Sequence, residues 1–255
     1  MPRFLKIIYE YFALYSSLTL LGLICLTWSV FALPLYFILP PRLGTAVGRR
    51  GIMTGFRIYS WSLSLTGTYR LDLKAIDTLK GGPPVILAPN HPALIDALLI
   101  LTRHPNLVCV MKSALMKNVF LGSGSRLARY VRNDSSRQMV KESVAHLQAG
   151  GVLLLFPEGT RTTRFPINPL AGSVGLIAKH AKVPVQTLII ETDSPFLSKG
   201  WPLFKRPDLP IMYRVRLGLR FDPPTDVPAF TAQLDRYYRQ ALQGAPQSRW
   251  LKHES

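Results

Sequence analysis

A histidine and an aspartate five positions apart interrupt an otherwise apolar stretch, VILAPNHPALIDALLI, which runs from Val85 to Ile100. A buried ionisable pair costs free energy unless its members satisfy each other. Pro92 favours the first position of a helix, which leaves His91 at the cap position just before it. The His91 ring can then fold over the first turn, so that the Asp96 carboxylate fixes its tautomer and leaves the other ring nitrogen basic. This arrangement is typical of a general base, and a capping histidine with an accidental acidic neighbour is the alternative.

A second group of polar residues follows the apolar run Val152–Phe156, in the sequence VLLLFPEGTRTTR. The proline and Gly159 predict a turn, which would present Glu158, Thr160 and Arg161 at the carboxyl end of a strand, where α/β proteins place their sites. A guanidinium held in a turn can bind two phosphate oxygens at once. Glu158 could orient Arg161 or a substrate hydroxyl, and a surface Glu/Arg pair is the alternative.

Short apolar runs alternate with helical patterns along the rest of the chain. This alternation predicts an α/β domain with a mostly parallel sheet flanked by helices. The expected strands span residues 69–77, 85–88, 107–111, 152–156, 183–191 and 211–221. The expected helices span residues 93–102, 112–130 with a break near Gly122-Ser123-Gly124, 135–148, 171–181 and 226–243.

The N-terminal part of the chain is apolar, and residues 11–41 carry no charged side chain. A membrane span needs only about 20 apolar residues. The segment could therefore cross a bilayer once, kinked at Pro34, or form a shallow helical hairpin within one leaflet; a buried core helix is the alternative. Residues 42–66 mix arginine with large apolar side chains, which predicts a connector helix at the headgroup level. We expect membrane-anchoring helices and this connector over residues 1–66 and a second domain over residues 67–255.

The charge balance favours an anionic partner. The chain has a formal net charge of +17 and is 48% hydrophobic but only 18% charged, which points to a membrane surface or a nucleic acid. A nucleic-acid binder would need a basic helix or an aromatic platform, and neither is found in the sequence. The uncharged N-terminal run is a further argument against that partner. Neither a GxSxG hydrolase turn nor a P-loop is present.

The remaining candidate ligands suggest no metal or disulfide site. Cys25 and Cys109 are the only cysteines, too few for a disulfide framework or a CxxC metal motif. The other histidines have no acidic neighbour at the end of a strand and are expected at the surface: His104, His146, His180 and His253.

The two polar stretches together resemble the motifs of the glycerolipid acyltransferases. The spacing from His91 to Asp96 matches the family's HX4D motif, and Phe156–Arg161 matches its FPEGTR block. AKVPVQTLII, at residues 181–190, resembles the fourth block of the family. The resemblance is to the branch that contains the 1-acylglycerol-3-phosphate acyltransferases, and it covers residues 70–220.

The resemblance implies a glycerol-3-phosphate acyltransferase-like fold, a membrane-binding N-terminal segment, a catalytic domain over residues 67–255 and roles for particular residues. It makes His91 and Asp96 catalytic, with helix N–H groups after His91 available to hold an oxyanion. It makes five residues substrate-binding: Glu158, Gly159, Thr160, Arg161 and Arg132. Arg132 is the preferred counterpart of the family's second-block arginine within GSGSRLARYVRND, with Arg129 and Arg137 as alternatives.

The reaction implied by the resemblance is O-acyl transfer in phospholipid biosynthesis. A fatty acyl group would move from acyl-CoA or acyl carrier protein to the hydroxyl of a lysophospholipid, with 1-acylglycerol-3-phosphate as the family default. Because the second block is altered, a lyso-ornithine lipid, a glycolipid or a polyene lipid is an alternative acceptor, and a non-catalytic lipid-binding protein is the alternative of another class. No cofactor and no metal are expected, and the expected partners are anionic membrane lipids, the acceptor and the acyl donor, with no nucleic acid. The expected location is a bacterial inner membrane, with the catalytic domain on the cytoplasmic face.

Overall fold

The computed structural model describes residues 2–253, and within that range its central feature is a seven-stranded sheet. In spatial order the strands are β1 (Tyr69–Asp72), β8 (Ile211–Phe221), β7 (Val185–Thr192), β2 (Val85–Pro89), β5 (Val152–Leu154), β3 (Leu107–Met111) and β4 (Val131–Arg132). A separate pair joins β6 (Arg164–Phe165) to β9 (Lys252–His253).

The sheet is mostly parallel, as the alternating pattern predicts. The strands β7, β2, β5, β3 and β4 run in one direction, and β8 and β1 run in the other. Every residue of β2 is buried, because a central parallel strand is covered by helices on both faces and needs a continuous apolar run. The expected α/β fold is confirmed.

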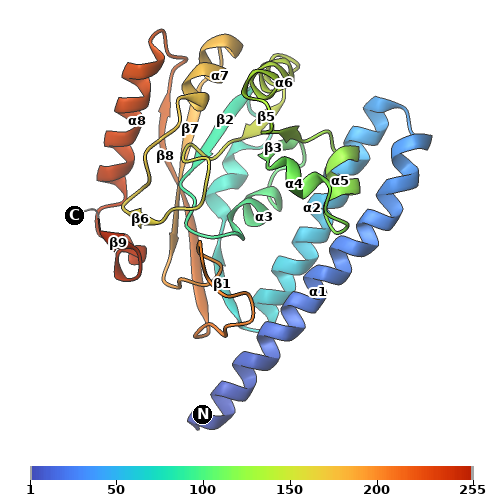
Figure 1. The fold of residues 1–255 in the computed structure, drawn as a ribbon, viewed down its shortest axis with the longest axis vertical. Coiled ribbons are helices and arrows are strands. Elements are labelled where there is room, and N and C mark those ends of the chain that lie inside the picture. Colours follow the sequence, from blue (N-terminus) through green and yellow to red (C-terminus); the bar gives the residue numbers. More distant parts are fainter. Residues whose placement is uncertain (1, 254–255) are drawn as a thin grey trace.

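Helices cover both faces of the sheet (Figure 1). The connection through α3 (Asp96–Leu101) leads from β2 toward the β4 edge, whereas α6 (Ser136–Gln148) and α7 (Ser173–Ala181) lie in connections that run the opposite way. Right-handed crossovers therefore place α3 on one face and α6 and α7 on the other. The helix α8 (Val227–Ala241) packs beside α7, and α2 (Pro41–Leu65) packs beside α3.

The N-terminal helices form a hairpin along one side of the domain (Figure 1). The helix α1 (Arg3–Ile38) continues through Pro34 and packs against α2 and α5. The helix therefore does not end at Pro34, and the hairpin turn falls at the end of the uncharged run over residues 11–41. The turn lies at Leu39 and Pro40, because proline forces the residue before it into an extended conformation and Pro41 suits the first position of the next helix.

Two other boundaries differ from the expected ones. The first strand ends at Asp72, and a 3-10 helix follows at Lys74–Leu79, because Leu73 and Ile76 are buried at a spacing of three residues rather than two. The expected helix over residues 112–130 is divided into α4 (Ser113–Met116) and α5 (Gly122–Leu127).

The expected break near Gly122-Ser123-Gly124 is present: it spans residues 117–121, and the glycines themselves begin α5. A Cβ on Gly122 would lie 2.4 Å from the Met116 carbonyl oxygen, and one on Gly124 would lie 2.7 Å from the Trp28 ring. These glycines therefore allow close packing of α5 against its neighbours, rather than ending a helix.

The histidines outside the candidate site differ from one another in burial. His104 is buried, which contradicts the expected surface position. His146 is half-buried, with Nε2 3.2 Å from the Val152 carbonyl oxygen, and burial lowers the pKa of His146 to about 4. His180 is exposed as expected, whereas the side chain of His253 lies outside the described residues.

Candidate active site

Three neighbouring parallel strands bring the candidate residues to one edge of the sheet. The strand β2 lies between β7 and β5. The carboxyl ends of these strands lead into residues 90–95, 155–163 and 193–210, respectively for β2, β5 and β7. Because parallel strands end at the same edge, the loops that carry His91 and Arg161 meet there.

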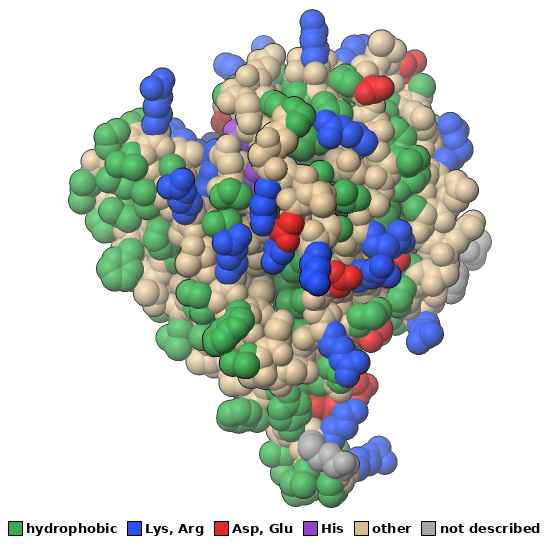
Figure 2. All heavy atoms as spheres, turned by 180° about the vertical axis from the view of Figure 1, so that it is seen from behind, with side chains coloured by type: hydrophobic (Ala, Val, Ile, Leu, Met, Phe, Trp, Pro, Cys, Tyr) green, Lys and Arg blue, Asp and Glu red, His purple; other side chains and the backbone are tan. Residues whose placement is uncertain are grey.

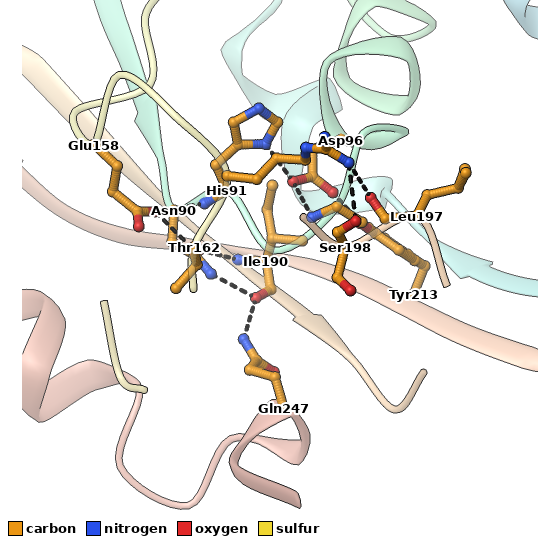
Figure 3. A network of polar contacts seen from close by, with 12 residues as sticks. Asn90, His91, Asp96, Glu158, Thr162, Ile190, Leu197, Ser198, Tyr213 and Gln247 are labelled. Atoms are coloured by element: carbon orange, nitrogen blue, oxygen red, sulfur yellow. Dashed lines mark hydrogen bonds and ion pairs between the residues drawn. The ribbon is translucent and has the colours of Figure 1, made fainter. Parts of the chain in front are cut away.

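His91 and Asp96 form a hydrogen-bonded pair. The His91 Nδ1 atom lies 2.7 Å from the Asp96 carboxylate, and Asp96 is fully buried. The imidazole stacks on the Phe156 ring, with centroids 3.8 Å apart. Figure 3 shows the other ring nitrogen of His91 directed away from Asp96. This geometry leaves Nε2 available to accept a proton.

The turn between these two residues is not helical. The helix α3 begins at Asp96, so the expectation that Pro92 is the first helical residue is wrong. The Asp96 carboxylate accepts a hydrogen bond of 2.9 Å from the Ala93 N–H, and the Leu94 N–H donates to the Leu197 carbonyl. These two N–H groups are therefore occupied by the chain itself, and an oxyanion role for other N–H groups after His91 stays a prediction.

Tyr213 completes the environment of the Asp96 carboxylate. This tyrosine projects from β8, is buried, and its hydroxyl donates to the second Asp96 oxygen. Burial raises the pKa of Tyr213 well above its ordinary value, and the neighbouring Asp96 charge raises it further. The hydroxyl therefore stays protonated and donates, which holds the carboxylate in position beneath His91.

Glu158 joins the two motif loops. One of its carboxylate oxygens accepts from the His91 N–H at 2.9 Å and from the Thr162 hydroxyl at 2.7 Å, and the other accepts from the Asn168 N–H at 3.0 Å. Burial raises the pKa of Glu158, and these donors only partly offset that effect. The expected role of Glu158 as a substrate ligand stays a prediction, and the geometry favours a role in fixing the backbone of His91.

The turn that precedes Arg161 needs a glycine at one position. The Gly159 N–H donates to the Phe156 carbonyl at 3.0 Å, and Gly159 has a φ of +65°. Side chains other than glycine rarely adopt this conformation. Thr160 is half-buried, and no group among residues 2–253 hydrogen-bonds to its hydroxyl. Gly159 therefore shapes the turn that presents Thr160 and Arg161.

Arg161 is held by the loop that follows β7. Its Nη1 atom donates to the carbonyl oxygens of Leu197 and Ser198 at 2.9 and 3.0 Å. The Leu94 N–H donates to the same Leu197 oxygen at 2.9 Å. One carbonyl oxygen therefore links the Arg161 side chain to the turn that follows His91. Within residues 2–253 its Nη2 and Nε atoms have no hydrogen-bond partner, which leaves them able to bind an anion.

Arg132 lies at the same edge of the sheet but apart from this cluster. It ends β4, which is separated from β2 by β5 and β3, so three strand spacings place it about 14 Å from the end of β2. Its side chain is exposed and lies 3.8 Å from Asp134. The structure therefore joins His91, Asp96, Glu158 and Arg161 and leaves Arg132 outside; Arg129 and Arg137 are exposed as well.

Several contributors to the site were missed by the sequence analysis. Asn90, directly before His91, bonds through its side chain to both backbone groups of Ile190 in β7, at 2.7 and 3.0 Å. The position of Asn90, a polar residue directly after an apolar strand-like run, was a sequence signal that could have indicated this contact. Tyr213 and the Leu197 and Ser198 carbonyls had no local signal, because they lie about 100 residues or more from the histidine in the sequence.

No group of three or more His, Cys, Asp or Glu side chains that could hold a metal ion occurs among the described residues.

Comparisons with known proteins agree with this geometry. Residues 70–191, which contain both motif loops, match the family model described as Acyltransferase. The fold is similar to the crystal structure of the 1-acyl-sn-glycerophosphate (LPA) acyltransferase PlsC from Thermotoga maritima, with a TM-score of 0.70 and 18% sequence identity over 99% of this chain and 100% of that one. No curated protein matches the sequence.

Proposed function

Residues 70–191 belong to the acyltransferase family, and on this premise we propose that the protein transfers a fatty acyl group from an acyl thioester to the hydroxyl of a lysophospholipid. The preferred acceptor is 1-acylglycerol-3-phosphate. The observation that supports this proposal is that the His91–Asp96 pair and the Arg161 guanidinium lie in neighbouring loops at one edge of the sheet. A general base and an anion-binding group in neighbouring loops suit a substrate that carries both a hydroxyl and a phosphate.

The proposed reaction uses His91 as the general base. The acceptor oxygen attacks the thioester carbonyl carbon while its proton moves to His91 Nε2. Asp96, which accepts from His91 Nδ1 at 2.7 Å, stabilises the imidazolium. The tetrahedral intermediate then expels the thiolate, which takes the proton from His91 and leaves as a free thiol. No acyl-enzyme and no cofactor are needed in this sequence.

Arg161 is proposed to bind the acceptor phosphate. The Leu197 and Ser198 carbonyls orient its Nη1 atom, and the remaining N–H groups can form charge-assisted hydrogen bonds to phosphate oxygens. Because Arg132 lies about three strand spacings away, one arginine rather than two would recognise the phosphate near His91. Lyso-ornithine lipid, glycolipid and polyene lipid acceptors therefore belong in the same assay.

The N-terminal hairpin is proposed to attach the protein to a membrane. Within residues 2–253, α1 is long and apolar enough to cross a bilayer by length and composition, and only 17% of its most apolar window is buried. Figure 2 shows hydrophobic side chains over the projecting end of the hairpin and over the N-terminal end of α1. A core helix would bury these side chains, so we propose a lipid contact.

One face of α1 contacts the domain along most of its length. Glu10 pairs with Arg206, Tyr9 donates to the Thr66 carbonyl at 2.5 Å, and Ser29 donates to the Phe120 carbonyl at 2.8 Å. A helix held in this way lies along the domain surface over most of its length. This packing favours a hairpin within one leaflet over a single span, with the site facing the same membrane surface.

The test is acyl transfer by the purified protein in mixed micelles. Labelled acyl-CoA and acyl carrier protein are supplied in turn with 1-acylglycerol-3-phosphate and with the alternative acceptors. We expect turnover, and His91→Ala should lower kcat by a factor of about 10²–10⁴. His180→Ala, which changes an exposed histidine on α7, is the matched control and should leave kcat unchanged.

Full activity of a folded His91→Ala protein would contradict the proposed base. Binding of the labelled donor without any turnover would instead identify a lipid carrier and overturn the proposed reaction.

A further inference from the structure

The loop between β7 and β8, residues 193–210, carries an exposed apolar tip. At this tip Leu203 is 47% exposed and Phe204 is 63% exposed. The tip is a folded structure: the Trp201 Nε1 atom donates to the Lys205 carbonyl at 3.2 Å, and the Lys205 ammonium lies 4.6 Å from the centre of the Trp201 ring. Two large apolar side chains therefore project from an ordered turn.

The tip adjoins the N-terminal half of α1 (Figure 1). The Phe204 ring stacks on Tyr15, with centroids 6.1 Å apart, and Tyr15 stacks on Tyr11 at 6.4 Å. Tyr11 and Tyr15 share one helix face with Phe4 and Ile8, because these four residues repeat at spacings of three and four. All four are exposed, so the tip extends the exposed apolar face of α1.

An ion pair with a buried carboxylate fixes the loop to α1. Glu10 is fully buried, pairs with Arg206 and also accepts from the Leu209 N–H at 3.2 Å. Because removing a partner from a buried carboxylate costs free energy, the loop and the helix are expected to move together. Any surface that receives this part of α1 would also meet Leu203 and Phe204.

The charges and aromatic groups around the tip fit a lipid headgroup layer. Lys199 and Lys205 are exposed beside it. Juxtamembrane lysines are attracted to anionic lipids, and tryptophan and tyrosine rings favour the membrane interface. From this combination we infer that the tip of the β7–β8 loop is a lipid-surface contact, inserting Leu203 and Phe204 into the leaflet that receives α1.

This contact would bear on the candidate site, and in that respect it rests on the proposed function. The stem of the same loop supplies the Leu197 and Ser198 carbonyls that hold Arg161, and Leu197 also accepts from Leu94. Docking of the tip on lipid would therefore hold the loop that positions the proposed phosphate ligand at the surface from which a lipid acceptor arrives.

The direct test places an environment-sensitive fluorophore at the tip. Phe204→Cys is labelled in a full-length background with Cys25→Ala and Cys109→Ala, and the protein is mixed with anionic phospholipid vesicles that contain a doxyl-labelled lipid. The matched control is Leu219→Cys, which is 57% exposed and lies near the far end of β8, about 25 Å along the strand from its start.

We expect a blue-shifted emission and a quenching constant several-fold larger at position 204 than at position 219. Equal quenching at the two positions would overturn the inference, as would failure of the labelled protein to bind vesicles. A blue shift without doxyl quenching, dependent on protein concentration, would instead identify a second copy of the chain as the partner. Quenching needs no turnover, so a protein that lacks acyl transfer but shows the expected quenching would contradict only the proposed function.

Two further variants separate apolar insertion from charge. Leu203→Ser with Phe204→Ser should weaken vesicle binding about tenfold, because two large side chains lose part of their burial. Lys199→Gln should weaken binding to anionic vesicles about fivefold at low salt and leave binding to neutral vesicles unchanged. Unchanged affinity of the double variant for both vesicle types would contradict the insertion.

Discussion

Replacing Glu158 by glutamine should destabilise the protein, because the carboxylate accepts only from internal donors. The glutamine oxygen can keep the bonds from the His91 N–H and the Thr162 hydroxyl, but its NH2 group then faces the Asn168 N–H. Losing that charge-assisted bond and leaving the donor unsatisfied costs about 1.5–3 kcal/mol. The retained bonds weaken by about 1 kcal/mol together when their acceptor becomes neutral.

Part of this loss is offset by removing a buried charge. Burial raises the pKa of Glu158, so the neutral amide is easier to bury than the carboxylate. The net decrease in unfolding free energy should be about 2 kcal/mol, which corresponds to a fall in Tm of about 4–8 °C for a chain of this size. Because the His91 N–H belongs to the same network, kcat should fall as well.

The assay compares thermal unfolding in detergent micelles with acyl-transfer kinetics. Glu142→Gln is the matched control, since Glu142 accepts from Gln138 on an exposed helix face, and its stability should change by less than about 0.5 kcal/mol. An unchanged Tm for Glu158→Gln, together with a raised KM for the acceptor, would refute this reasoning. That result would support Glu158 as a ligand of the substrate.

Three further changes test neighbouring parts of the structure. Tyr213→Phe removes the hydroxyl that donates to Asp96, so the unfolding free energy should fall by about 1.5–3 kcal/mol; denaturant unfolding that matches the wild type would exclude this bond. Arg161→Lys replaces a planar fork by a single ammonium, so the acceptor KM should rise about tenfold while kcat changes little, and steady-state kinetics would reveal any other pattern. Burial and Arg49 lower the pKa of His146 from 6.5 to about 4, so on acidification the unfolded chain binds a proton first and stability falls between about pH 6.5 and pH 4. His146→Gln should lose most of this pH dependence, and equal slopes for the two proteins in that range would contradict the assignment.

The elements that depend on local patterns were predicted well. The strand over residues 211–221 has the expected bounds, and β2 differs from its expected range by one residue, because alternation and continuous apolar runs report burial directly. The start of α3 was placed wrongly. Proline at residue 92 favours a helix start. The Ala93 N–H instead donates to the Asp96 carboxylate and the Leu94 N–H donates to the Leu197 carbonyl. The tertiary contact with Leu197 therefore contributed to the local conformation.

The sequence by itself determined the α/β class, the apolar N-terminal helix, and the pairing of His91 with Asp96, because each depends on residues close together in the chain. Only the tertiary structure decided that Glu158 ties the two loops together, that Tyr213 donates to Asp96, and that Leu197 and Ser198 hold Arg161. It also decided that Arg132 lies apart from the histidine. The physical reason is that the spatial order of the strands differs from their order in the chain, so the groups that meet at the sheet edge are set by strand pairing and not by distance along the sequence.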